Sequence, residues 1–344
     1  MQSLFNIINI PLGYVLKFLS EILGGNFAAS VLVFTLLINI VLIPLSIKSQ
    51  KSSVAQMRIK PKLDELKKKY GDDRQKMAQA QQKLYQDEGV SMSGGCLPLV
   101  VRMVLLFSIY WLILSPLTYM AGADKTKVSN VTTAINTTLK DLKENDEKEY
   151  NAVNEEIQWK LNGSNTYELS LVRIIRDNPE KIKEILSDED YSKIEEDYNY
   201  VIGKYKEANI SFNLFGIDLT LKPDFAFDIF NAWQPIWLLP IVAFLAQMLT
   251  SVVSMQINKR INPDAPNMAG MMLTMPLLSL FIGFSFPGGV CFYWICSSLI
   301  GGGIQSAIQL IYGPHKLLAR DRAKELSKVC DFEAGQIKKF EGEQ

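Results

Sequence analysis

The sequence has few of the residues that catalytic and metal sites use most. Its single histidine, His315, leaves no His-based triad and no two-histidine zinc motif. No Walker A loop is present either. The cysteines match neither a zinc pattern nor a disulfide framework, and they lie at Cys96, Cys291, Cys296 and Cys330. We therefore expect no enzymatic activity, no bound metal and no cofactor.

Long apolar runs dominate what the sequence does contain. Five segments are nearly free of charge and long enough, or almost so, to cross a membrane: residues 28–46, 96–119, 233–255, 268–286 and 288–312. A helix of about 20 such residues crosses a hydrocarbon core of roughly 30 Å. The pattern predicts an all-α integral membrane protein with five transmembrane helices, which we number spans 1 to 5.

The connecting segments differ in the sign of their charge, although the net charge is zero. Residues 47–89 contain 11 Lys/Arg and 6 Asp/Glu, whereas residues 121–231 contain 14 Lys/Arg and 22 Asp/Glu. An excess of Lys and Arg marks the cytoplasmic loops of a membrane protein. We predict a multi-pass protein of the cell membrane, with the N-terminus and residues 120–232 outside. The predicted cytoplasmic segments are residues 47–95, 256–267 and 313–344.

The segment before span 1 predicts an amphipathic helix. Within residues 1–27, one helical face collects the apolar side chains of Leu12, Val15, Leu16, Leu19, Ile22 and Leu23. Such a helix is expected to lie in the outer membrane interface. A sixth membrane span is the alternative, which the charges of Lys17 and Glu21 disfavour.

The segment between spans 1 and 2 predicts an antiparallel helical hairpin. We expect Gly71 to end its first helix in the left-handed conformation and Asp73 to cap the second helix. Apolar residues at helical spacing are expected to meet in one seam, namely Leu63, Leu66, Tyr70, Met77, Ala80, Leu84 and Tyr85. The alternative is a solvated connection with no further role. Residues 120–232 predict a small, mainly helical external domain.

Polar residues inside the predicted spans are the candidate functional residues. Arg102 lies six residues into span 2, roughly 9 Å from its cytoplasmic end, and Asn39 in span 1 is at a similar depth. Gln247 and Ser251 in span 3 approach the same level. Water satisfies such groups most cheaply, so they predict a wet cavity open to the cytoplasm. Two alternatives stay open: ordinary hydrogen bonds between helices, and an arginine that reaches the lipid headgroups.

Three phrases of the sequence resemble the YidC family of membrane protein insertases. Residues 35–45 (TLLINIVLIPL) resemble the opening of the family's core, and residues 94–99 (GGCLPL) resemble the start of its second span. Residues 286–294 (FPGGVCFYW) resemble its turn between spans 4 and 5. The phrases occur in order, so the resemblance covers most of the chain except residues 121–231. An insertion between spans 2 and 3 is similar to Gram-positive type members with an added domain.

The resemblance implies five helices around a hydrophilic groove that is open to the cytoplasm and to lipid. Family members insert single-span and small membrane proteins, alone or beside the Sec translocon, and a groove arginine attracts the substrate's short tail. The implied groove residues are Thr35, Asn39, Arg102, Gln247, Ser251 and Trp294. The implied partners are nascent membrane proteins and the lipid bilayer, with the Sec translocon and the ribosome as further candidates and no DNA.

One departure from the family pattern concerns the groove arginine. The family's arginine in span 1 occupies the position that Asn39 has here. Arg102 lies where relatives commonly carry an uncharged polar residue, at matching depth on the facing span. We hypothesise that the positive charge has moved from span 1 to span 2.

Two other functions stay open at this stage. One is a small-solute channel or transporter that uses the polar groove, and the other is a membrane-anchored scaffold that presents residues 120–232. A transporter is expected to show internal repeats and broken half-helices, and neither is evident. A scaffold is expected to tolerate neutralisation of Arg102.

Overall fold

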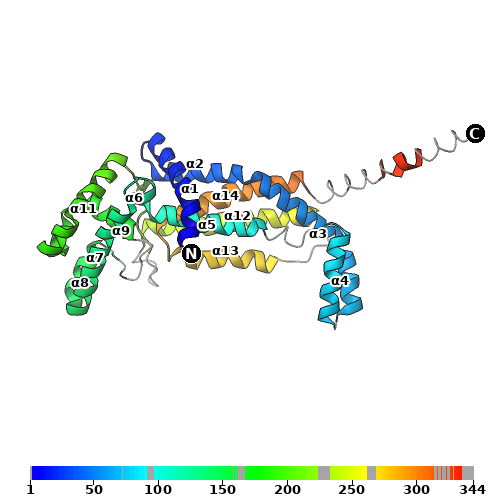
Figure 1. The fold of residues 1–344 in the computed structure, drawn as a ribbon, viewed down its shortest axis with the longest axis horizontal. Helices are drawn as coiled ribbons and strands as arrows, with labels where there is room; N and C mark the ends of the chain where they lie inside the picture. The colour runs from blue at the N-terminus through cyan, green and yellow to red at the C-terminus, as the bar shows by residue number, and fades with distance from the viewer. Residues whose placement is uncertain are drawn as a thin grey trace, which may run out of the picture. The chain divides into compact units, whose positions relative to one another are not determined.

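The computed structural model describes residues 2–71, 73–90, 97–157, 159, 161, 167–223, 233–261, 269–313 and parts of 316–334 (Figure 1). Its contacts divide the chain into two units, which we describe separately. Unit 1 consists of Met1–Ile38, Met103–Met248 and Thr274–Ile300, and unit 2 consists of Asn39–Arg102, Leu249–Leu273 and Gly301–Gln344. Parts of several predicted segments lie outside the described residues: residues 1 and 72, residues 91–96 up to the start of span 2, residues 158, 160, 162–166 and 224–232 of the predicted external segment, residues 262–268 up to the start of span 4, and most of the tail.

The described chain is almost entirely helical. The helices, in chain order, are α1 (Gln2–Ile22), α2 (Phe27–Val41), α3 (Ile43–Tyr70), α4 (Arg74–Asp87), α5 (Leu97–Leu114), α6 (Pro116–Tyr119), α7 (Lys125–Asn145), α8 (Glu147–Ile157), α9 (Tyr167–Asp177), α10 (Lys181–Ile185), α11 (Asp188–Ala208), the 3-10 helix η2 (Pro235–Trp237), α12 (Leu238–Ile261), α13 (Ala269–Gly283) and α14 (Gly288–Ile311). One antiparallel hairpin of two-residue strands, β1 (Asn213–Leu214) and β2 (Ile217–Asp218), is a small departure from the predicted all-α fold.

Several of these helices are apolar enough to lie in a membrane. Among the described residues, Pro235–Arg260 and Gly288–Ile311 have the length and composition of membrane spans. Helices α2 and α3, which meet at an angle of 49°, count as a third if the pair is one bent span. Val100–Leu114 and Thr274–Gly283 are shorter apolar helices. The prediction of a helical membrane protein is confirmed, whereas the number of five spans stays a prediction.

The segment predicted as span 1 is not one straight helix. Helix α2 ends at Val41, and α3 begins at Ile43 and continues without interruption into the first arm of the hairpin. Pro44 causes this break, because proline has no N–H group and its ring collides with the carbonyl four residues earlier. The apolar run of the sequence hides the break, since Leu42, Ile43 and Leu45 continue it.

The predicted apolar face of helix α1 is partly buried in protein and partly exposed. Leu16 and Leu19 are buried in the core of unit 1, so this part of the face packs against protein. Val15 and Ile22, which we assigned to the same face, are exposed. They belong instead to a second apolar stripe, whose exposed members also include Ile7, Ile10, Tyr14 and Phe18. The predicted location of α1 in the membrane interface stays a prediction.

The inserted domain (residues 120–232) contributes a large part of the apolar core of unit 1. Helices α7, α8, α9 and α11 contribute buried side chains to it, and α7 lies beside α11 (Figure 1). Trp159 is fully buried, stacks on Tyr167 at a ring distance of 4.9 Å and donates a hydrogen bond to Asn136 Oδ1 at 3.2 Å. The Asn136 amide is therefore part of the packing of this domain.

In unit 2, α3 and α4 form the predicted antiparallel hairpin (Figure 1). The Asp73 carboxylate accepts a hydrogen bond from Lys76 N at 3.0 Å, which confirms the predicted cap. The prediction for Gly71 is wrong, because its φ of −54° is right-handed. All seven residues of the predicted seam are half-buried. Glu88 pairs with both Lys62 and Arg58, which joins the end of α4 to α3.

The contact between α12 and α14 in unit 2 gives a matched pair of predictions. A Cβ atom added at Gly302 would lie 2.8 Å from Thr250 Cβ and 2.5 Å from Thr250 Cγ2, whereas one at Gly303 would meet nothing within 4 Å. We expect Gly302→Ala to separate the helices and to destabilise the protein by about 1 to 3 kcal/mol. Gly303→Ala should be neutral or stabilising, because alanine favours helix. Thermal unfolding in nanodiscs measures both, and equal melting temperatures for the two variants would contradict the close contact.

Candidate functional site

The guanidinium of Arg102 lies between two helices of unit 2. Its Nη2 donates to Ser46 Oγ of α3 at 3.1 Å and to Gln305 Oε1 of α14 at 3.2 Å. Both acceptors are neutral, and among the described residues no carboxylate lies within 4 Å of this guanidinium. The side chain is also exposed on the surface of the protein. Arg102 therefore carries a positive charge that these contacts orient without neutralising it.

Helix α14 supplies a polar ridge to this site. Gly301, Gln305 and Gln309 follow at intervals of four residues, which places them on one face of the helix. A Cβ atom at Gly301 would lie 3.0 Å from Asn39 Oδ1, so the Asn39 amide rests against the ridge. Arg102 contacts the same ridge at Gln305, one turn or about 6 Å further along. The two residues that we expected at one depth on spans 1 and 2 thus meet one face of α14.

A second hydrogen bond extends the ridge towards α12. Ser254 Oγ and the side-chain amide of Gln309 are 3.4 Å apart. Ser251, the predicted site residue on this helix, lies one turn before Ser254 and is half-buried. Polar groups from α2, α3, α5, α12 and α14 therefore occur together in unit 2.

The other three predicted site residues belong to unit 1. Thr35 is buried in α2, and its hydroxyl donates to the carbonyl of Val31 in the same helix at 2.6 Å. Gln247 is a half-buried residue of α12. Trp294 packs edge-on against Phe286 at a ring distance of 5.5 Å. The packing of Trp294 is thus aromatic, in a cluster that Phe286 continues to Tyr110.

Sequence analysis missed the residues that hold Arg102. Ser46 was treated as the end of span 1, and Gln305 and Gln309 were not considered. A signal for the two glutamines does exist, because they are four residues apart in an apolar helix and so share a face. Nothing in the sequence indicates which of the polar residues Arg102 selects.

A carboxylate of the inserted domain binds the short helix α6 in unit 1. Glu168 Oε2 accepts from Thr118 N at 3.0 Å and Oε1 accepts from Thr118 Oγ1 at 2.7 Å. Burial raises the pKa of Glu168 to about 7, and the hydrogen bonds from Thr118 only partly offset this rise. The link between α9 and α6 therefore contains a group that titrates near neutral pH.

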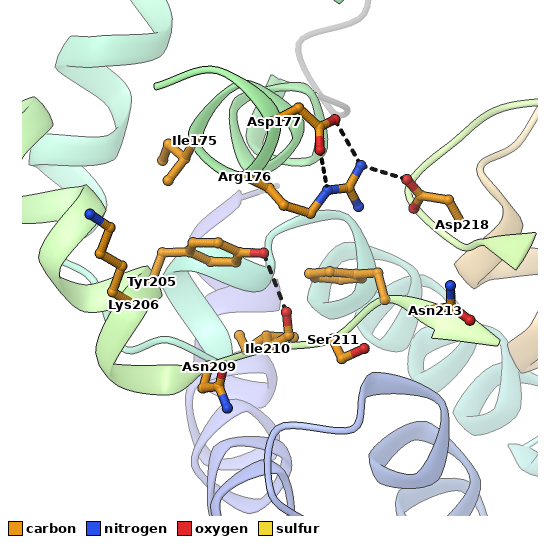
Figure 2. Close-up of a pocket in the computed structure, with 11 residues that line it drawn as sticks. Ile175, Arg176, Asp177, Tyr205, Lys206, Asn209, Ile210, Ser211, Asn213 and Asp218 are labelled. Carbon is orange, nitrogen blue, oxygen red and sulfur yellow. Dashed lines mark hydrogen bonds and ion pairs between the residues drawn. The ribbon is translucent and has the colours of Figure 1, made fainter. Parts of the chain in front are cut away.

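The inserted domain also contains an open cavity of about 660 Å³ (Figure 2). Arg176 lies on one side, with Nε 2.7 Å from Asp177 Oδ1 and Nη2 2.7 Å from Asp218 Oδ2. Tyr205 lies across from it and donates to the carbonyl of Ile210 at 3.3 Å. The Arg176 guanidinium therefore already has two carboxylate partners. No group of three potential metal ligands occurs among the described residues.

The helices and the polar site together define a helical membrane protein with a charged residue among its apolar helices. The chain belongs to the 60Kd inner membrane protein family, whose model matches residues 18–175 and 197–313. This match extends further than the predicted resemblance, because within residues 121–231 it omits only residues 176–196. Our expectation that the family pattern leaves out the whole inserted domain was therefore wrong.

Curated relatives align with about a third of this chain. A protein from Shewanella woodyi called membrane protein insertase YidC is 42% identical over 106 residues, which are 30% of this chain and 19% of the relative. A protein of the same name from Haemophilus ducreyi is 44% identical over 102 residues, 29% of this chain and 19% of the relative. The chain thus matches about a fifth of the length of these relatives.

The pKa of Glu168 predicts how the stability of unit 1 depends on pH. A carboxyl whose pKa is about 7 in the folded state and 4.5 in the unfolded chain stabilises the fold when it is protonated. Its stabilising effect is present below pH 4.5 and is lost as the pH rises to about 7. We expect Glu168→Gln to remove this loss and to melt above the wild type at pH 8, with a smaller difference at pH 5. Glu196→Gln, at a side chain that is 95% exposed, is the matched control and should keep the wild-type pH dependence. A Glu168→Gln profile parallel to the wild type would contradict the assignment.

Proposed function

We propose that this chain is a membrane protein insertase. It receives the short hydrophilic tail of a nascent membrane protein in a recess around Arg102 and releases the apolar segment into lipid, alone or with the Sec translocon. Membership of the family and the name of the curated relatives support this function. The observation that carries it is the Arg102 guanidinium, which is exposed and, within the part of the chain that the structure describes, hydrogen-bonded to two neutral oxygens.

An arginine in an apolar helix is retained at an energetic cost. Placing it at the centre of a membrane helix costs about 2.5 to 3.5 kcal/mol on insertion scales. Ser46 and Gln305 reduce this cost by accepting hydrogen bonds, and in this proposal water or a substrate group solvates the remaining donors. An acidic tail that enters the recess exchanges bulk water for this guanidinium and the polar ridge. Binding in a recess also shortens the path across lipid on which the tail lacks polar partners.

The proposed arrangement has five spans around this recess. The N-terminus and the inserted domain are outside, and the α3–α4 hairpin and the tail are in the cytoplasm, where nascent chains and the ribosome arrive. In this arrangement Arg102 takes over the role that the family's arginine has at the position of Asn39. The shared ridge of α14 supports the exchange, because side chains from both positions reach it one turn apart.

The first prediction for this function concerns the charge of the substrate tail. In proteoliposomes, the wild type should insert a single-span substrate with an acidic tail faster than the same substrate with a neutral tail. We expect Arg102→Gln to reduce the acidic preference by about 1 kcal/mol, or about fivefold, because a partly exposed ion pair contributes about that much. Protease protection of the inserted tail measures the rate. The control is Arg58→Gln, which removes a hairpin charge that Glu88 already pairs.

The same assay separates the proposed function from its competitors. A scaffold would insert neither substrate, and a solute channel would release an encapsulated dye without protecting any tail. Equal acidic preference in the wild type and in Arg102→Gln would remove Arg102 from the mechanism while leaving family membership intact.

A second prediction tests whether the charge has changed helix. We expect Arg102→Ala to impair insertion and the double variant Arg102→Ala with Asn39→Arg to restore it, since an arginine at position 39 lies one turn from Gln305 on the ridge. Growth of a strain depleted of its own insertase is the readout. Asn39→Lys in the same background controls for charge alone. No rescue by Asn39→Arg would show that the two positions are not equivalent.

A further inference from the structure

Two carbonyl groups near the end of the inserted domain cap the first turn of α14. Gly288 N donates to the carbonyl of Leu221 at 2.8 Å, and Gly289 N donates to the carbonyl of Leu219 at 2.8 Å. The first N–H groups of a helix have no partner within the helix, and the helix dipole favours electron-rich groups there. We call residues 219–221 the capping segment. It satisfies backbone donors of α14 with backbone acceptors from elsewhere in the chain.

The first turn of α14 is also packed too closely for side chains. A Cβ atom at Gly288 would lie 2.8 Å from Ile236 Cδ1 and 3.3 Å from Leu219 Cα. One at Gly289 would lie 3.1 Å from Phe27 Cε1 and 3.2 Å from Ile113 Cγ2. The starts of α2 and α14 and the end of α5 therefore meet at this turn, all within unit 1.

Arg173 of α9 holds the capping segment in place. Its Nη1 donates to the carbonyl of Thr220 at 2.9 Å, and its Nη2 donates to the carbonyl of Ile157 at 3.2 Å and to Ser170 Oγ at 3.1 Å. Burial lowers the pKa of Arg173 only to about 10, so the side chain stays protonated at neutral pH. One guanidinium thus ties the end of α8, the body of α9 and the middle of the capping segment together.

A second set of bonds reaches the same segment. Asp218 Oδ1 accepts from Thr220 N at 2.8 Å and from Thr220 Oγ1 at 2.7 Å, while Arg176 of α9 binds Asp218 Oδ2. The cavity of Figure 2 lies beside this pair. Leu219 and Thr220 are buried, so the position of the capping segment depends on packing as well as on these directed bonds.

We propose that the inserted domain is a brace that holds the N-terminal turn of α14 against α2 and α5, with Arg173 as its positioning residue. The proposal assigns a role to residues 120–232 and does not depend on the insertase function. In the topology proposed above, the braced turn is the extracytoplasmic end of α14. The brace then keeps this end of the helices closed.

Hydrogen exchange on the full chain in nanodiscs tests the brace directly. In Arg173→Met, we expect the amides of residues 286–291 to exchange at least about tenfold faster than in the wild type, because the capping carbonyls are no longer held. Arg173→Lys keeps the charge on a single donor nitrogen in place of the guanidinium fork and should give an intermediate rate. Lys193→Met, which removes an exposed charge of α11 paired only locally, is the matched control and should leave residues 286–291 protected.

The same data distinguish a brace from a residue that merely stabilises its own domain. Protection of α7 and α11 should stay at the wild-type level in Arg173→Lys. Unchanged exchange at residues 286–291 in both Arg173 variants would overturn the proposal. So would a loss of protection through the whole inserted domain without a larger effect at residues 286–291.

Native cysteines give a second readout of closure. Cys291 is fully buried one turn after the capped residues, and its Sγ lies 3.4 Å from the carbonyl of Gly283. With the other cysteines replaced by serine, a membrane-impermeant maleimide added outside should leave Cys291 unmodified in the wild type and label it in Arg173→Met. Labelling of Cys291 at equal rates in the two proteins would contradict closure by the brace.

Discussion

The pairing of the Arg102 guanidinium with neutral oxygens is the constraint on which the rest of the site depends. A carboxylate beside Arg102 would have neutralised the charge of the guanidinium. Without any hydrogen-bond acceptor, the guanidinium would have been an unsolvated cation among apolar helices, at a large cost in free energy. Ser46 and Gln305 provide an intermediate solution, because they fix the direction of the side chain and leave its charge available. Asn39 and Ser254 also approach the face of α14 that carries Gln305 and Gln309.

Helix α14 combines two opposite kinds of packing along its length. Its first turn has glycines because backbone and side chains of other elements approach within 3.3 Å of where a Cβ would lie. Its second half carries Gln305 and Gln309 among apolar residues, and these two bind side chains of α5 and α12. Close packing resists water, whereas amide and guanidinium groups require polar partners. The sequence of one helix thus specifies a closely packed start and a polar end, and the proposed brace acts on the start.

The sequence was sufficient for features that depend on local patterns. The length of the apolar segments predicted a membrane protein. The apolar seam from Leu63 to Tyr85 predicted the helical hairpin, and the short side chain of Asp73 predicted the cap of its second helix. Arg102 and Asn39 could be chosen as site residues because a charge or an amide in an apolar run is costly wherever it points. Features that depend on contacts distant in sequence could not be predicted. Gln305 is 203 positions from Arg102, and the capping of Gly288 by Leu221 depends on how residues 219–221 fold back onto α14.

The most direct test of the central claim is water access at the position of Arg102. Cysteines placed at positions 100 and 102 of α5 point about 200° apart around the helix, and Val100 is an exposed apolar residue. In inverted membrane vesicles, a water-soluble maleimide reacts only with a thiol that water can reach and ionise. The account predicts rapid modification of Arg102→Cys and slow modification of Val100→Cys. Equally slow modification of both would place Arg102 against lipid and contradict a wet, positively charged recess.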